Sequence, residues 1–250
     1  MDEVSYKEKV LKAGEQAFKA TIIEKPKEIK DKKSLMIEYA RCGDNYWIND
    51  RVRFMVVGRA PGVFKKDDHN VMNYLDDNGC LFSENKIEYC FDEHYKEGLD
   101  WIHSKSDDDK KKRKRYIDAK PFFCFAKKVY LRLTEKEQNF EWYKNICHSN
   151  IYKIVSTSGG NPSSRLTKAQ ENEMLRIMKV EFEFFRPTHI LVIDGEGEEH
   201  CWCTRIKADL KKNAESFGAK IWFSDRPETR KAEDLIKRID EVDVNFWQKK

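Results

Sequence analysis

The sequence predicts an α/β fold of three layers (α/β/α), in which helices cover both faces of a central four-stranded parallel sheet. Four short apolar segments, rich in β-branched and large side chains, have the length of buried strands. Longer segments with apolar residues at helical spacing separate them, so strands and helices alternate along the chain. The 250 residues include 12% aromatic residues and only six prolines, and no linker-like stretch interrupts them. One domain covering residues 1–250 is therefore expected.

Each predicted strand is followed by a turn or loop. The strands cover residues 52–57, 149–155, 189–193 and 220–223. In a parallel sheet the loops that follow the strands emerge at one edge, and open α/β folds bind their ligands there. A functional site is therefore expected after Val57, Val155, Ile193 and Phe223.

Helices are predicted where apolar residues recur every three or four positions. They cover about residues 6–18, 35–42, 122–133, 142–146, 167–186, 202–217 and 232–242. Thr167 and Gln170 match a capping box, which predicts that Thr167 begins its helix. Residues 1–45 are expected to form an N-terminal helical extension and residues 86–120 a charged insertion.

Charge, targeting signals and cysteine content limit the partners, location and cofactors that we expect for this protein. The net charge of +4 is weak evidence for a nucleic-acid partner by itself. The N-terminus lacks the pattern of a signal peptide, and no apolar segment approaches the length of a membrane span, so a cytoplasmic protein without a membrane partner is expected. The protein is also expected to be a monomer. The seven cysteines include no C-x-x-C pair. They are expected to be reduced thiols, with no metal and no other cofactor.

Residues 105–115 carry seven basic and three acidic side chains and no apolar one. This run fits a phosphate-contacting insertion. It fits a solvated charge run equally well.

The first predicted strand runs into a glycine-rich turn, Gly58-Arg59-Ala60-Pro61-Gly62. Such a turn places backbone N–H groups at the edge where the strand ends. The turn alone fits a simple strand connection. It also fits the phosphate-binding turn of a small-molecule enzyme, although neither G-x-x-x-x-G-K-[ST] nor G-x-G-x-x-G is present.

Taken together, four short motifs resemble those of the uracil-DNA glycosylase superfamily. The G-x-x-P-G turn at residues 58–62 comes first, and a G-x-x-F element at residues 79–82 follows. A strand with Asn150 is third, and residues 226–229 stand where the family has a histidine loop. Each motif is weak alone, but their order and α/β context over roughly residues 50–240 are more specific.

This resemblance implies a uracil-DNA glycosylase-like fold, and a protein that binds single- or double-stranded DNA and flips a uracil or related deaminated base into a pocket. Phe82 would stack on the base, and the Asn150 amide would read its edge with one donor and one acceptor. Arg226 would stabilise the negative charge of the departing base. The base would also contact Gly58, Arg59, Ala60, Pro61 and Gly62. The DNA backbone would be bound by Lys153, Arg165, Pro227 and Arg230.

Plainer interpretations stay open for most of these residues. Phe82 fits a core side chain, Asn150 fits a turn cap at a strand end, and the basic residues fit solvated charges.

The first turn departs from the superfamily in a way that bears on catalysis. The family usually has Asp, Asn or Glu there, whereas this chain has Arg59 and Ala60. Arginine cannot act as a general base. The candidates for that role are Asp67, Asp68 and His69. The sequence therefore leaves two functions open: a glycosylase that hydrolyses the N-glycosidic bond, or a catalytically impaired relative that binds nucleic acid or a nucleobase.

Overall fold

The structure is a computed structural model that describes most, but not all, of the chain. The described residues are 1–23, 35–48, 51–59, 98–99, 102, 120–136, 141–156, 162–194, 205–225, 227, 237–240 and 244–248. Most of the predicted insertion at residues 86–120 and most of the predicted helix at 232–242 lie outside these ranges.

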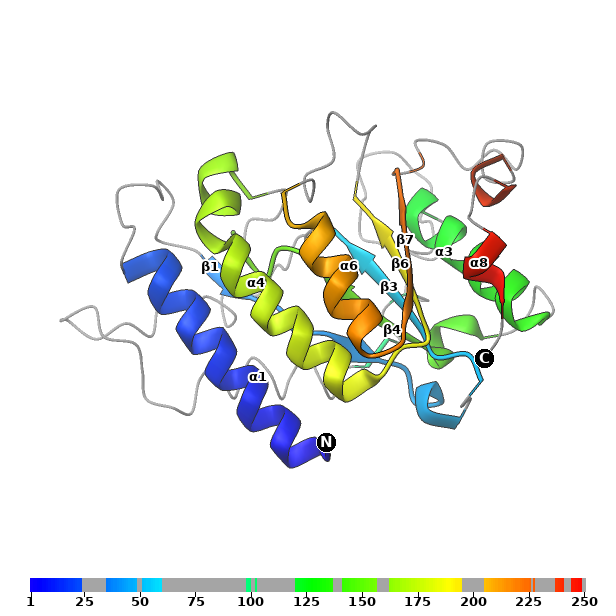
Figure 1. The fold of residues 1–250 in the computed structure, drawn as a ribbon, viewed down its shortest axis with the longest axis horizontal. Helices are drawn as coiled ribbons and strands as arrows, with labels where there is room; N and C mark the ends of the chain where they lie inside the picture. Colours follow the sequence, from blue (N-terminus) through cyan, green and yellow to red (C-terminus); the bar gives the residue numbers. More distant parts are fainter. Residues whose placement is uncertain are drawn as a thin grey trace, which may run out of the picture.

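The fold is a mixed α/β arrangement around a five-stranded, mostly parallel sheet (Figure 1). The strand order is β2-β4-β3-β6-β7. The strands are β2 (Arg41–Cys42), β4 (Ile146–Asn150), β3 (Phe54–Gly58), β6 (His189–Ile193) and β7 (Lys220–Ser224). β4, β3, β6 and β7 pair in parallel, which confirms four parallel strands, but the sheet has five strands and not the predicted four. β2 joins it as an antiparallel edge strand.

Helices contact both faces of the sheet. Successive side chains of a strand point to opposite faces, so each strand contributes residues to both cores. Met55 and Val57 of β3 belong to one core cluster, and Phe54 and Val56 belong to the other. The first cluster includes residues of α1 (Glu3–Phe18), α4 (Ser164–Phe185) and α6 (Lys207–Ser216). The second includes residues of α3 (Pro121–Thr134) and α8 (Val244–Trp247). Burial on both faces explains why β3 and β6 consist almost entirely of apolar residues.

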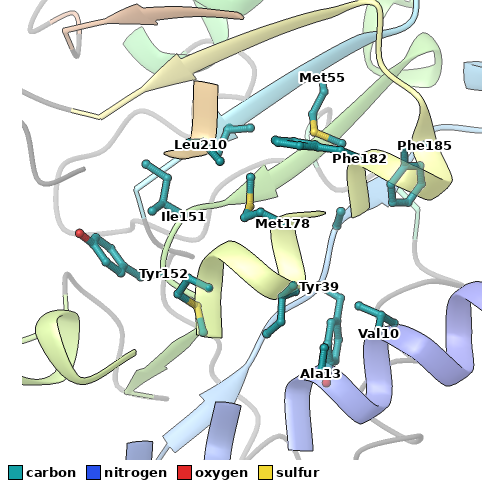
Figure 2. Packing of buried hydrophobic residues seen from close by; sticks show 14 of the residues in the cluster. Val10, Ala13, Tyr39, Met55, Ile151, Tyr152, Met178, Phe182, Phe185 and Leu210 are labelled. Carbon is teal, nitrogen blue, oxygen red and sulfur yellow. The ribbon is translucent and has the colours of Figure 1, made fainter. Parts of the chain in front are cut away.

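The core on the first face is organised by α4. Met178, Phe182 and Phe185 are buried on one side of this helix. Figure 2 shows Phe182 beside Met55 of β3, with Leu210 of α6 on the same side of the sheet. In Figure 1, α1 lies along α4, which itself lies next to α6.

The predicted first helix is confirmed, and it packs against α4 through aromatic rings. The ring of Tyr6 stacks on Phe184 with 4.0 Å between centroids, and its edge meets Phe185 at 5.3 Å. Asp2 caps the helix by accepting a hydrogen bond from the Ser5 N–H at 2.9 Å. A π-helical turn, η1 (Lys19–Ile23), continues α1.

The predicted helix over residues 35–42 is wrong. This segment forms β1 (Leu35–Ile37) and β2, and β1 pairs antiparallel with β5 (Ile154–Ser156) in a second, two-stranded sheet. In a segment of eight residues, neither the helical nor the strand period repeats often enough for the apolar pattern to distinguish a helix from a strand. Residues 1–45 are therefore not only a helical extension, since β2 belongs to the central sheet.

The segment predicted as one strand at residues 149–155 contains parts of two strands. β4 ends at Asn150, and β5 begins at Ile154 in the other sheet. Trp142 and Ile146, predicted on a helix, lie instead in the 3-10 turn η9 (Trp142–Asn145) and at the start of β4. The edge where the parallel strands end, here called the carboxyl edge, therefore follows Asn150 and not Val155.

The N-cap of α4 is Ser163, so the predicted cap at Thr167 is wrong. The Ser163 side chain accepts a hydrogen bond from the Leu166 N–H at 3.2 Å. Thr167 lies one turn inside the helix, and its buried hydroxyl has no hydrogen-bond partner in the described part of the chain. The Gln170 amide instead binds the backbone of Ile154 of β5, at 3.0 and 2.8 Å.

We expect Ser163→Ala to lower the free energy of unfolding by about 1 kcal/mol, because the Leu166 N–H loses its acceptor. Thr167→Val should leave it unchanged or raise it, because it removes an unpaired buried hydroxyl at nearly constant volume. Urea denaturation followed by circular dichroism measures both. A larger loss for Thr167→Val than for Ser163→Ala would contradict this assignment of the cap.

Candidate functional site

The ends of β3 and β4 lie directly side by side at the carboxyl edge. Gly58 is the register partner of Asn150, and the Ile151 N–H donates to the Gly58 carbonyl at 2.9 Å. A Cβ atom on Gly58 would lie only 2.7 Å from Oδ1 of Asn150. Glycine therefore leaves the space that the amide oxygen occupies. The structure thus brings together residues from two of the motifs, the first turn and the asparagine strand.

Arg59 connects this edge to the next strand, β6. Its Nε and Nη2 donate to the Asp194 carbonyl at 2.9 and 2.6 Å, and Nε lies 3.5 Å from the Asp194 carboxylate. The Asp194 N–H donates to the Ser224 carbonyl at 3.2 Å, and the Tyr152 N–H donates to the Arg59 carbonyl at 2.9 Å. These contacts join the ends of all four parallel strands.

Arg59 and Asp194 flank the point where the strand order changes direction. The chain leaves β3 for β4 on one side, then passes to β6 on the other side of β3. In open α/β sheets, connections that diverge in this way leave a crevice at the carboxyl edge, and ligands bind in it. The topology therefore favours the region around Gly58, Arg59 and Asp194 as a binding site.

Four charged side chains are buried beside Asn150, and we call them the ionic cluster. They are Glu38, Arg41, Lys153 and Glu181, and none is more than 3% exposed. An unpaired charge in a protein interior costs several kcal/mol, so buried charges need close partners. All four have such partners.

Lys153 and Glu181 form the first half of the cluster. The Lys153 ammonium group lies 2.7 and 2.9 Å from the two carboxylate oxygens of Glu181, and it donates to Oγ of Ser149 at 2.6 Å. Ser149 donates to Glu181 at 2.8 Å, and the Ala40 N–H donates to the same carboxylate at 2.9 Å. One ion pair thus connects α4, the end of β4 and the residue before β2.

Glu38 and Arg41 form the second half, which reaches Asn150. Oε1 of Glu38 lies 3.2 Å from Nη2 of Arg41, and Oε2 accepts from Nδ2 of Asn150 at 2.7 Å. Burial raises the pKa of Glu38, while the charges of Arg41 and Lys153 and the hydrogen bond from Asn150 act in the opposite direction. The amide at the predicted base-binding position is therefore held by a buried carboxyl group.

Lys153 was predicted to bind the DNA backbone, and this prediction is wrong. Its side chain is fully buried and ion-paired with Glu181, so the ammonium group cannot reach a phosphate at the surface. The residues around it, Ile151, Tyr152 and Ile154, are also fully buried. A single lysine within an apolar run was the signal of an interior ion pair.

Two further predicted DNA contacts lie among the described residues. Arg165 is exposed in the first turn of α4, and α4 begins at the end of the molecule toward which β3 and β6 point (Figure 1). Its position is compatible with a phosphate contact at the carboxyl edge. Pro227 is buried, which corrects its prediction as a DNA contact, because such a contact needs an exposed side chain.

The other predicted site residues lie outside the described residues. They are Ala60, Pro61, Gly62, Asp67, Asp68, His69, Phe82, Arg226 and Arg230. The stacking role of Phe82 and the catalytic roles of the acidic residues, His69 and Arg226 stay predictions. The basic run at residues 105–115 also lies outside.

Sequence reasoning missed Glu38, Arg41, Glu181 and Asp194. Asp194 directly follows a strand that was predicted correctly, so its place at the carboxyl edge was available from the sequence. Glu181 lies three residues after Met178 in the buried stripe of α4, which marks a charge in a core position. Glu38 and Arg41 carried no such signal, because their segment fits a helix and strands equally well.

The described residues offer no metal site and no membrane span. Among them, no three His, Cys, Asp or Glu side chains gather in a way that could hold a metal ion. Of the helices in the same ranges, none combines the length and hydropathy needed to cross a membrane.

Comparison with known proteins does not assign a family. Neither the models of known protein families nor the curated proteins compared with the chain give a match. The resemblance to uracil-DNA glycosylases therefore rests on the motifs of this chain alone.

We expect Lys153→Met to lower the free energy of unfolding by roughly 3–5 kcal/mol, because it leaves the Glu181 carboxylate buried without its counter-charge. Lys9→Met is the matched control, since Lys9 pairs with Glu183 at 3.0 Å on the surface. The control should cost less than about 1 kcal/mol. Equal losses for the two variants in urea denaturation would contradict the buried position of Lys153.

His148, at the register position of β3 residue Val56, makes stability depend on pH. Burial, and then the charges of Arg41 and Lys153, lower its pKa from 6.5 to about 3. Between these values the unfolded state binds the extra proton, so stability is lost as pH falls through this window. We expect His148→Gln to reduce the stability lost between pH 7 and pH 5 by roughly 2 kcal/mol.

Urea denaturation at both pH values measures this difference. The raised pKa of Glu38 acts with the opposite sign, because it favours the folded state as the carboxyl group gains a proton. Glu38 is present in both proteins, so the comparison isolates His148. Identical pH dependence in the variant and the unmodified chain would show that His148 has the same pKa in the folded and the unfolded protein, which contradicts the lowered pKa.

Proposed function

We propose that the chain is a DNA glycosylase-like protein with a three-layer, uracil-DNA glycosylase-like fold. It binds DNA and takes a flipped uracil or related deaminated base into a site at the carboxyl edge of β3 and β4. The observation that carries this proposal is the register pairing of Gly58 with Asn150. It joins the first and third motifs of the resemblance at the edge where α/β folds bind ligands.

The chemistry of the Asn150 amide supports recognition of a base. An amide offers one acceptor and one donor side by side, which complements the adjacent N–H and carbonyl groups of uracil. Asn150 is only 2% exposed, so a base that reached it would leave water. A site with buried polar groups discriminates strongly, because a mismatched ligand leaves those groups unpaired.

The start of α4 supports a role in binding the DNA backbone. Arg165 is exposed there, and the N–H groups of a helix N-terminus attract phosphate. α4 begins on the side of the carboxyl edge, so phosphates bound at this point would follow the same edge as the base site (Figure 1).

A catalytically impaired glycosylase-like protein, which binds DNA or a nucleobase without hydrolysis, is the second candidate. Arg59 favours it, because this side chain occupies a turn where the family has a polar or acidic residue and is bound to Asp194. Its positive charge would oppose a developing sugar cation. Hydrolysis requires another group to orient water, and Asp67, Asp68 and His69 are the proposed ones.

The test of hydrolysis uses single- and double-stranded oligonucleotides with one uracil, followed by alkaline cleavage of abasic sites. If the chain is an active glycosylase, strands with uracil are cut, and strands with cytosine at the same position are not. Asn150→Ala should abolish the product, whereas Lys9→Met should leave it unchanged. No product over hours with protein in excess, while a known glycosylase cuts the same strands, rejects hydrolysis.

Binding measurements separate the second candidate from a protein that recognises no base. A binding protein without hydrolysis should bind the uracil strand in a salt-dependent way, and Asn150→Ala or Phe82→Ala should weaken that binding by about tenfold or more. If neither substitution changes the affinity for the uracil strand, the protein has no base site next to Gly58.

A further inference from the structure

The orientation of the Asn150 amide is set by its contact with Glu38. Nδ2 of Asn150 donates to Oε2 of Glu38 at 2.7 Å. The amide oxygen lies on the other side, at the space left by the missing side chain of Gly58. An ionised carboxylate can only accept hydrogen bonds, so it binds the NH₂ end of the amide and not the oxygen end. As long as Glu38 is ionised, the amide cannot turn over without placing two acceptors in contact.

Glu38 is itself fixed by its surroundings. Its carboxylate pairs with Arg41, and its backbone N–H donates to the Lys153 carbonyl at 3.0 Å. The charged groups that act on it are Arg41, Lys153 and Glu181. Because this carboxylate is buried and paired on both oxygens, it has no solvent-exposed alternative position. While Glu38 is ionised, the amide orientation is therefore set by the folded chain and does not depend on a ligand.

A fixed amide distinguishes two bases of nearly the same shape. Uracil presents a carbonyl acceptor next to an N–H donor on its pairing edge. Cytosine presents an amino donor next to a ring-nitrogen acceptor at the corresponding positions. An amide that complements one order therefore places donor against donor and acceptor against acceptor with the other. Shape alone cannot make this distinction, so the order of the amide atoms decides it.

We propose that Glu38 is a positioning residue that locks the Asn150 amide and thereby gives the site its preference for bases with an N–H beside a carbonyl. Uracil and hypoxanthine have this arrangement, whereas cytosine and adenine have an amino group instead. The inference rests on the proposed function, because it requires a base at Asn150. The selectivity of the site then depends on a residue outside all four motifs.

The test compares the affinity of the full chain for two single-stranded oligonucleotides that differ at one central nucleotide. This nucleotide is 2′-fluorodeoxyuridine or 2′-fluorodeoxycytidine, because the fluorine withdraws electrons from the sugar and prevents loss of the base during binding. Fluorescence anisotropy gives the ratio of the two dissociation constants. For the unmodified chain we expect about tenfold tighter binding of the uracil strand.

Glu38→Gln should reduce this preference to about twofold or less, because a glutamine amide can donate or accept and so permits both orientations of Asn150. Glu173→Gln is the matched control, since Glu173 is also largely buried and pairs with Arg176 at 3.0 Å. It should keep the full preference. A purely structural role of Glu38 would weaken binding of both strands equally and leave their ratio unchanged.

Glu38→Asp provides a second variant in case the glutamine variant does not fold. It keeps a negative charge for Arg41 but withdraws the carboxylate from Asn150 by one methylene group, so the ratio should again fall. An unchanged ratio in whichever variant folds, with a preference for uracil in the unmodified chain, overturns the role of Glu38 and leaves the proposed function intact. Equal binding of both strands by the unmodified chain rejects base recognition itself.

Discussion

The buried ion pair between Lys153 and Glu181 holds in place the region on which the candidate site depends. It joins the turn after β4 to α4, and Glu181 also accepts the N–H of Ala40 next to β2. Separating these charges inside the protein would cost several kcal/mol, so the turn has one stable position. Asn150 directly precedes this turn, so the ion pair fixes the path of the chain immediately after Asn150.

The ionic cluster and the strand ends make separate contributions to the candidate site. Backbone hydrogen bonds set the distance between β3 and β4 and place Gly58 beside Asn150. Arg59 donates a hydrogen bond to the carbonyl of Asp194 and so connects the ends of β3 and β6. At the end of β4, Nδ2 of Asn150 donates to Glu38, which in our proposal orients this amide. Buried charges at such a position are costly for folding. Ionisable groups with perturbed pKa values are common at functional sites, because catalysis needs tuned pKa values.

Local patterns predicted the central sheet but not the polar interior beside it. Parallel strands covered on both faces leave continuous apolar runs, which is why 52–57 and 189–193 were recognised. The strands at 35–42 were mistaken for a helix, because pairing with β4 and β5 decides their conformation and this pairing is not visible locally. Asn150 and Gly58 were predicted together, whereas the link from Glu38 to Asn150 joins residues 112 positions apart and required coordinates.

The most direct measurement is a crystal structure of the chain bound to a single-stranded oligonucleotide with one 2′-fluorodeoxyuridine. We expect the uracil edge within hydrogen-bond distance of Oδ1 and Nδ2 of Asn150, while Nδ2 still donates to Glu38. Uracil bound away from Gly58 and Asn150, or an Asn150 amide turned with its oxygen toward an ionised Glu38, would contradict this expectation.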